Sequence, residues 1–114
     1  MTRFRPGDVV LIRFPFTDLS TSKQRPAVVL SPSAFMARQG DLVVLAMTSQ
    51  PQRDTKLRVS QWRLAGLPKP TWLKPVIGTI ATELVVRRMG RLRSGDVRRV
   101  RLALQQAIAS VFLA

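Results

Sequence analysis

The sequence contains no cysteine, no histidine and only six acidic residues among its 114 residues. Disulfides and thiolate metal sites are therefore excluded. The absence of histidine removes the commonest general acid or base near neutral pH and the commonest transition-metal ligand. The acids are scattered, with no DxD or ExxE pair that would suggest a dedicated metal cage. Any chemistry is therefore expected to need neither a metal ion nor another cofactor.

Long apolar runs are also missing from the chain. No stretch approaches the roughly 18 apolar residues of a transmembrane helix, and the start MTRFRPGDVV lacks the apolar core of a signal peptide. We therefore expect a cytoplasmic protein that does not associate with a membrane. An apolar fraction of 46% and a charged fraction of 22% are ordinary for a folded protein, and the length suits one domain over residues 1–114.

The charge that is present is strongly one-sided. Lysine and arginine number 19, the formal net charge is +13, and 15 of these cations are arginine. The planar guanidinium pairs with phosphate through two hydrogen bonds and stacks on bases, which lysine does not do. A phosphate polymer is thus the leading partner. An acidic protein partner and a GC-rich genome that favours arginine codons are the alternatives.

Short β-branched runs between turn signals predict mainly β structure. Three successive runs of similar build suggest a curved antiparallel sheet or a small barrel. A short helical turn is expected at residues 34–39, and a turn near 82–83. Strands are expected at residues 9–14, 26–31, 42–47, 57–60, 73–81 and 84–89.

One long helix is expected from residue 94 to the end of the chain. Ser94 or Asp96 can cap its first turn. Apolar residues recur at spacings of three and four, which predicts a single buried face. That predicted face consists of Val97, Val100, Leu104, Ala107, Ile108 and Val111.

Several short motifs occur in a fixed order on these successive elements. They are GDVV (7–10), RPAVVLS (25–31), TSQ (48–50), GLPKPTW (66–72) and GRL (90–92). The ordered set spans almost the whole chain and resembles the MazF/PemK family of toxin endoribonucleases. The segment FPFTD (14–18) resembles the PemK-like branch, because many other members carry a Gly/Glu/Gln-containing segment before the arginine.

The resemblance implies a fold, an activity and partners. The expected fold is an SH3-like barrel of mostly antiparallel strands with a C-terminal α-helix, and the expected assembly is a homodimer. The implied activity is that of a type II toxin, which cleaves single-stranded mRNA at short sequences without a metal and is neutralised by a small acidic antitoxin. The family's two main active-site positions fall on Arg25 and Thr48.

Arg25 and Thr48 suit the chemistry of such a cleavage only in part. A guanidinium can hold two phosphoryl oxygens and stabilise their charge, and a threonine hydroxyl can donate or relay a hydrogen bond. Arginine stays protonated, so the general base is another group: a substrate group, a water molecule or Asp18. Further candidates for substrate binding are Lys23, Gln24, Ser49, Gln50, Arg53 and Lys56.

Two other functions compete with this reading. The chain could be a non-catalytic binder on the same barrel, as in the gyrase-inhibiting relatives, or a plain RNA-binding protein whose positive charge provides all of its affinity. Trp62 and Trp72 can stack on bases, although packing in the core or in a dimer is the more usual role of such residues.

Overall fold

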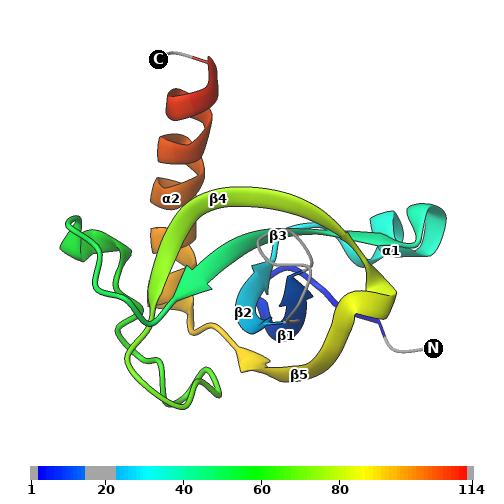
Figure 1. Ribbon diagram of the computed structural model, residues 1–114, viewed down its shortest axis with the longest axis horizontal. Coiled ribbons are helices and arrows are strands. Elements are labelled where there is room, and N and C mark those ends of the chain that lie inside the picture. The colour runs from blue at the N-terminus through cyan, green and yellow to red at the C-terminus, as the bar shows by residue number, and fades with distance from the viewer. Residues whose placement is uncertain (1–2, 15–22, 113–114) are drawn as a thin grey trace.

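The computed structural model describes residues 3–14 and 23–112, and Figure 1 shows their arrangement. None of the helices in these residues is long and apolar enough to cross a membrane. The elements in chain order are β1 (Asp8–Phe14), β2 (Lys23–Val29), α1 (Ser33–Gln39), β3 (Asp41–Thr48), η1 (Thr55–Leu57), β4 (Trp72–Ala81), η2 (Thr82–Leu84), β5 (Val85–Arg91) and α2 (Ser94–Phe112).

The five strands form one sheet in the order β4-β3-β2-β1-β5, and every pairing is antiparallel. Its two edge strands, β4 and β5, are consecutive in the chain and are joined only by the three residues of η2. So short a link requires the sheet to curl until its edges approach each other. Figure 1 shows β4 and β5 curving around β1 and β2. The predicted barrel-like antiparallel sheet with a C-terminal helix is confirmed.

The strand that carries Arg25 differs from its prediction. β2 was expected over residues 26–31 but begins at Lys23, so that Pro26 lies within it. Proline has no amide hydrogen to donate to a ladder. The pairing of β2 with β3 accordingly ends at Ala27 and Ala46, directly next to Pro26.

The strand predicted at residues 57–60 is wrong. The side chain of Asp54 accepts a hydrogen bond from the amide of Lys56, which favours the 3-10 helix η1 at this point. Only one isolated β-bridge follows, between Arg58 and Trp72. The alternation of apolar and polar residues did reflect burial, because Leu57 and Val59 are both buried. After η1, however, only Arg58 forms a β-bridge, so no ladder results.

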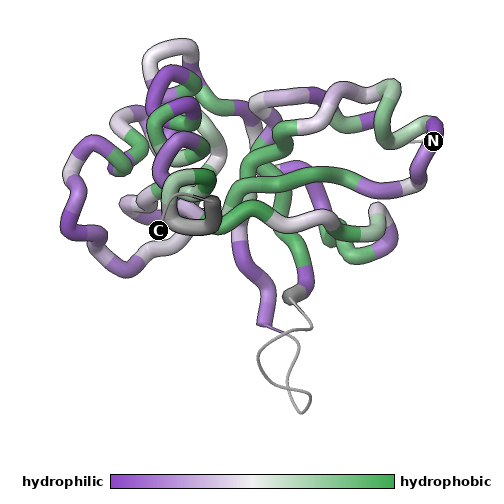
Figure 2. Tube along the Cα trace, turned by 90° about the horizontal axis from the view of Figure 1, so that it is seen from above, coloured by the Kyte–Doolittle hydropathy of each residue, from purple (hydrophilic) through white to green (hydrophobic). Residues whose placement is uncertain are grey.

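Two apolar clusters pack against the two faces of the sheet. One contains Val9, Val28 and Leu45 and lies beneath α2 and the segment 57–67. The other contains Val10, Ile12 and Val29 and is covered by residues that include Phe4 and Met36. Figure 2 shows hydrophobic stretches gathered in the middle of the molecule and hydrophilic stretches in its outer loops.

The helix α2 begins at Ser94 as expected, but its buried face differs from the prediction. Val100, Ala103 and Ala107 face the core, whereas Val97 and Ile108 are 46% and 48% exposed. This rotation of the helix about its axis places Asp96, near its start, on the buried face, where the carboxylate bonds to the segment after η1.

Asp96 does not cap its own helix with its side chain. Its carboxylate is 1% exposed and accepts hydrogen bonds from the amides of Ser60, at 2.8 Å, and Gln61, at 2.9 Å. Arg99 also lies 3.5 Å from this carboxylate. These bonds connect the segment after η1 to the start of α2 at the edge of the core.

Gly90 gives a direct test of the packing around β5. A Cβ at this position would collide with the carbonyl oxygen of Ala65, whereas a Cβ at Gly95 in α2 would meet open space. We expect Gly90→Ala to lower the free energy of unfolding by about 1–3 kcal/mol or more, because the backbone must move. Gly95→Ala, as the matched control, should raise it by up to about 1 kcal/mol. Urea unfolding of both variants measures this, and equal effects would contradict the close approach.

Candidate functional site

Arg25 and Thr48 lie at the same end of the sheet on neighbouring strands. The pairing of β1 with β2 sets Arg25 opposite Ile12. The register between β2 and β3 ends at Ala27 and Ala46, and two further residues along each strand bring Arg25 opposite Thr48. Opposed residues of antiparallel strands project to the same face. This register therefore sets the two predicted catalytic residues at the same end of neighbouring strands, and their catalytic role stays a prediction.

Pro26 shapes this position. Because the ladder between β2 and β3 stops beside it, Arg25 and Thr48 lie beyond the last residues that pair these two strands, although Arg25 is paired with Ile12 of β1 and Thr48 with Trp72 of β4. Arg25 is exposed and Thr48 is half-buried. The strand ends can therefore admit a ligand between two side chains without first breaking backbone hydrogen bonds.

The row across the sheet continues from Thr48 to Trp72 on β4. The guanidinium of Arg58 lies 5.8 Å from the centre of the Trp72 ring, within the range of a cation–π contact. Trp72 is half-buried and Arg58 is exposed. Arg58 was not among the predicted site residues. Little in the sequence indicates this residue, because the isolated bridge that places Arg58 beside Trp72 joins residues that are distant in the chain.

The hydroxyl of Thr48 already has one fixed bond. Its Oγ1 accepts a hydrogen bond from the amide of Gln50 at 3.1 Å. A hydroxyl has one hydrogen to donate in addition to its acceptor positions. The bond from Gln50 thus orients the hydroxyl while leaving its hydrogen available to a ligand. Ser49, between them, is half-buried.

Lys23 and Gln24 are both exposed at the start of β2, but on opposite faces. Successive strand residues alternate between faces, so Lys23 shares the face of Arg25. Gln24 lies opposite Arg13 on β1, on the other face. Of these two predicted substrate-binding residues, Lys23 is therefore the one placed to act beside Arg25.

Arg53 and Lys56 lie on the segment that follows β3, and the backbone of this segment is anchored. Asp54 accepts bonds from the amide of Lys56, at 2.9 Å, and from the side chain of Gln106 on α2, at 2.8 Å. Chiefly the backbone bond from Lys56, and then the bond from Gln106, hold the pKa of Asp54 below its ordinary value of 3.8. The side chains of Arg53 and Lys56 are exposed on this fixed segment.

The structure does not identify a general base. Asp18, one of the three predicted candidates, lies outside the described residues. Of the five described acids, Asp8 and Asp96 are buried in ion pairs, and Asp54 is bonded to Lys56 and Gln106. The other two, Asp41 and Glu83, lie at the start of β3 and in η2, at the end of β3 opposite to Thr48. A substrate group, a water molecule and Asp18 therefore remain the three alternatives.

Comparison with known families finds one match. Residues 5–108 match a family described as PemK-like, MazF-like toxins of type II toxin-antitoxin systems. No curated protein matches the chain.

Several solved structures share the fold at low sequence identity. MazF from Deinococcus radiodurans superposes with a TM-score of 0.74 at 18% identity, covering 96% of this chain and 99% of that one. An endoribonuclease in complex with its cognate antitoxin, from a mycobacterial species, gives 0.67 at 18% identity and covers 96% of each chain. The toxin MazF-mt6 of Mycobacterium tuberculosis gives 0.65 at 20% identity, covering 95% of this chain and 96% of that one.

Asp54 generates a prediction about pH. Because folding lowers its pKa, its stabilising contribution should be complete above the ordinary value of 3.8 and should be lost as pH falls through the depressed value. The difference in urea midpoint between the wild type and Asp54→Asn should therefore be largest at neutral pH and shrink in acid. Gln106→Ala, which removes one donor, should give an intermediate pH dependence. A difference that does not change with pH would contradict this assignment.

Proposed function

The chain belongs to the PemK-like, MazF-like toxin family of type II toxin-antitoxin systems, and on that premise we propose that it is a toxin endoribonuclease that cuts single-stranded mRNA without a metal ion. Its substrate places this activity in the cytoplasm. The observation that supports the proposal is the register between β2 and β3, which ends at Ala27 and Ala46 and, continued by two residues, sets Arg25 opposite Thr48.

The proposed reaction uses the RNA's own nucleophile. The 2′-hydroxyl attacks the adjacent phosphorus, its proton passes to the general base, and the bond to the 5′-oxygen breaks. The products are a 2′,3′-cyclic phosphate and a 5′-hydroxyl end, which takes up a proton. The protein must hold the phosphate in line for attack and stabilise the charge that grows on its oxygens.

Arg25 and Thr48 divide this work. Arg25 is exposed at a strand end, where its guanidinium can bind both non-bridging oxygens of the phosphate. Thr48, oriented by the amide of Gln50, donates its hydroxyl hydrogen to a phosphate oxygen or to the leaving group. Proton abstraction belongs to the substrate, a water molecule or Asp18, because a guanidinium stays protonated.

The substrate strand extends beyond the cleaved phosphate over neighbouring groups. Lys23 on the face of Arg25 and the exposed Arg53 and Lys56 supply positive charge for flanking phosphates. Gln24, Ser49 and Gln50 supply hydrogen-bond donors and acceptors. Trp72, with Arg58 over its ring, offers a partly open aromatic face for a base.

Two protein partners are proposed with this activity. The first is a small acidic antitoxin, because the chain has a net charge of +13 and the similar structures include an endoribonuclease bound to its cognate antitoxin. The second is another copy of the chain. Val97 and Ile108 on α2 and Val76 and Ile77 on β4 are large apolar residues left more than 40% exposed, which suits a homodimer.

Substitution of the two central residues tests the catalytic proposal. Arg25→Ala should slow the cleavage of a long single-stranded RNA about 100- to 1,000-fold, because it removes the main stabiliser of the phosphoryl charge. Thr48→Ala should also slow it, and Thr48→Ser, which keeps the hydroxyl, should recover most of the loss. The assay is run in EDTA, and the ends of the fragments are mapped for 5′-hydroxyls.

Arg38→Ala is the matched control, because Arg38 is an exposed arginine on α1, away from the site. It should cleave at the wild-type rate. Equal rates for Arg25→Ala and Arg38→Ala would refute the role of Arg25. Binding of RNA without any cleavage by the wild type would instead indicate a plain RNA-binding protein.

A further inference from the structure

A surface pocket of about 340 Å³ lies away from Arg25 and Thr48, where β1 begins and β5 ends. Four arginines line it: Arg5, Arg88, Arg91 and Arg93. The same lining includes only one acid, Asp8. Arginine stays charged at any physiological pH, so four cations face one carboxylate. Such crowding of like charge is unfavourable until an anion enters.

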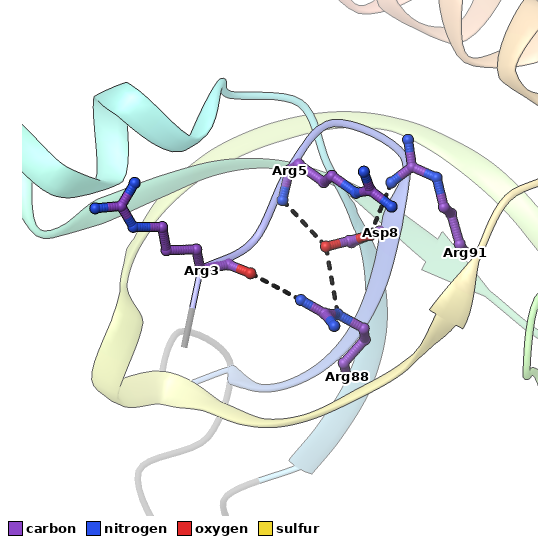
Figure 3. A network of polar contacts seen from close by, with 5 residues as sticks. All are labelled: Arg3, Arg5, Asp8, Arg88 and Arg91. Atoms are coloured by element: carbon purple, nitrogen blue, oxygen red, sulfur yellow. Dashed lines mark hydrogen bonds and ion pairs between the residues drawn. The ribbon is translucent and has the colours of Figure 1, made fainter. Parts of the chain in front are cut away.

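Asp8 is already bonded on both of its carboxylate oxygens, as Figure 3 shows. Its Oδ1 accepts from Arg91 Nη1 at 2.9 Å. Its Oδ2 accepts from the amide of Arg5 at 3.0 Å and lies 3.3 Å from Arg88 Nε. The side chain of Asp8 is only 3% exposed. Its role is therefore to fix the two guanidiniums rather than to neutralise the pocket.

The guanidiniums that Asp8 holds are oriented yet open to solvent. Arg88 also donates from Nη2 to the carbonyl of Arg3 at 2.7 Å, and its guanidinium lies 5.5 Å from the centre of the Phe4 ring. The side chains of Arg88 and Arg91 nevertheless remain 46% exposed. Donors fixed before binding lose little conformational entropy when a ligand arrives.

Arg5 and Arg93 supply the charge that is not balanced. Within residues 3–14 and 23–112, neither guanidinium forms an ion pair or a hydrogen bond. Both line the pocket beside the oriented pair. The pocket thus combines two fixed cations with two that can close on a ligand.

We propose that this pocket binds a backbone phosphate of single-stranded RNA at a distance from the cleaved bond, an inference that rests on the proposed function. Asp8 and Ile12 are four residues apart on β1, about 13 Å along the strand, and Ile12 lies opposite Arg25. Between these points, Val10 lies opposite Arg88 of β5 and projects to the same face of β1 as Ile12. Because opposed residues share a face, Arg88 and Arg25 project to the same face of the sheet.

An RNA strand fits the pocket better than an acidic protein segment does. Protein interfaces depend on a buried apolar centre with a few anchoring side chains. This pocket has a single large apolar residue in its lining, Leu64, which is 59% exposed and can contact a sugar or a base. A wall that is mostly guanidinium is typical of nucleic-acid interfaces, which are polar and strongly positive.

The test measures the binding of a fluorescently labelled single-stranded 2′-O-methyl RNA of mixed sequence by anisotropy across a range of salt. This RNA lacks the free 2′-hydroxyl and so cannot undergo the proposed cleavage. The variants are Arg5→Gln, Arg93→Gln and the double variant, which leave the bonds of Asp8 intact. The control is Arg38→Gln, which removes one positive charge elsewhere, as each single variant does, and thermal unfolding checks that each variant is folded.

Arg5→Gln and Arg93→Gln should each bind more weakly than Arg38→Gln, which removes the same single charge. The double variant, which removes two charges, should bind about 3- to 10-fold more weakly than Arg38→Gln, and its salt dependence should fall by about one phosphate contact. Arg93→Lys, which keeps the charge but not the planar fork, should retain the salt dependence of the wild type. Binding by the double variant equal to that of Arg38→Gln would overturn the inference. So would unchanged RNA binding together with lost binding of a poly-glutamate peptide, which would assign the pocket to an acidic protein.

Cleavage of unmodified RNA by the wild type keeps this inference separate from the proposed function. If the wild type cuts RNA and the double variant binds as tightly as Arg38→Gln, only the phosphate pocket is wrong. If the wild type does not cut but the double variant loses affinity and salt dependence, the pocket is supported and the endoribonuclease proposal fails.

Discussion

The short link between β4 and β5 is the constraint on which the rest of the structure depends. These strands are the two edges of the sheet, and only the three residues of η2 join them, so the sheet must curl. In the curled sheet, β5 with Arg88 and Arg91 pairs with β1, which also pairs with the strand of Arg25. β1 therefore connects the two sites: its residue Ile12 lies opposite Arg25, and its residue Asp8 lines the arginine pocket. The positions of both sites depend on the curling of the sheet.

Two buried aspartates serve different ends in a chain with few acids. Asp96 binds backbone amides of the segment after η1 and so holds α2 over one core. Asp8 binds the side chains of Arg88 and Arg91 and so orients cations at the surface. A buried carboxylate is tolerated only when its oxygens are bonded. Each buried carboxylate therefore fixes the groups that bond to it. At Asp8 these groups are arginine side chains that remain exposed, so they can also bind a ligand.

The proposed chemistry depends on electrostatics because the usual proton-transfer groups are missing. With no histidine in the chain, rate enhancement must come mainly from positioning the phosphate and stabilising its charge. Arg25 and Thr48 can do both at the ends of β2 and β3, where Pro26 stops the backbone ladder. An excess of arginine over lysine suits this mode of action, because a fork of donors also orients the group it binds.

Much of the fold could be predicted from the sequence, because strands, turns and the start of α2 follow from local patterns, and the central residues of the candidate site stay a prediction. The same patterns failed at residues 57–60 and for Val97 and Ile108, where capping by Asp54 and the tether at Asp96 prevailed. Arg25 and Thr48 were recognisable as motif residues. By itself the sequence determined an arginine-rich, mainly β chain without histidine or cysteine. Only the tertiary structure decided which arginines share Asp8, because these contacts join Asp8 to Arg88 and Arg91, far along the chain.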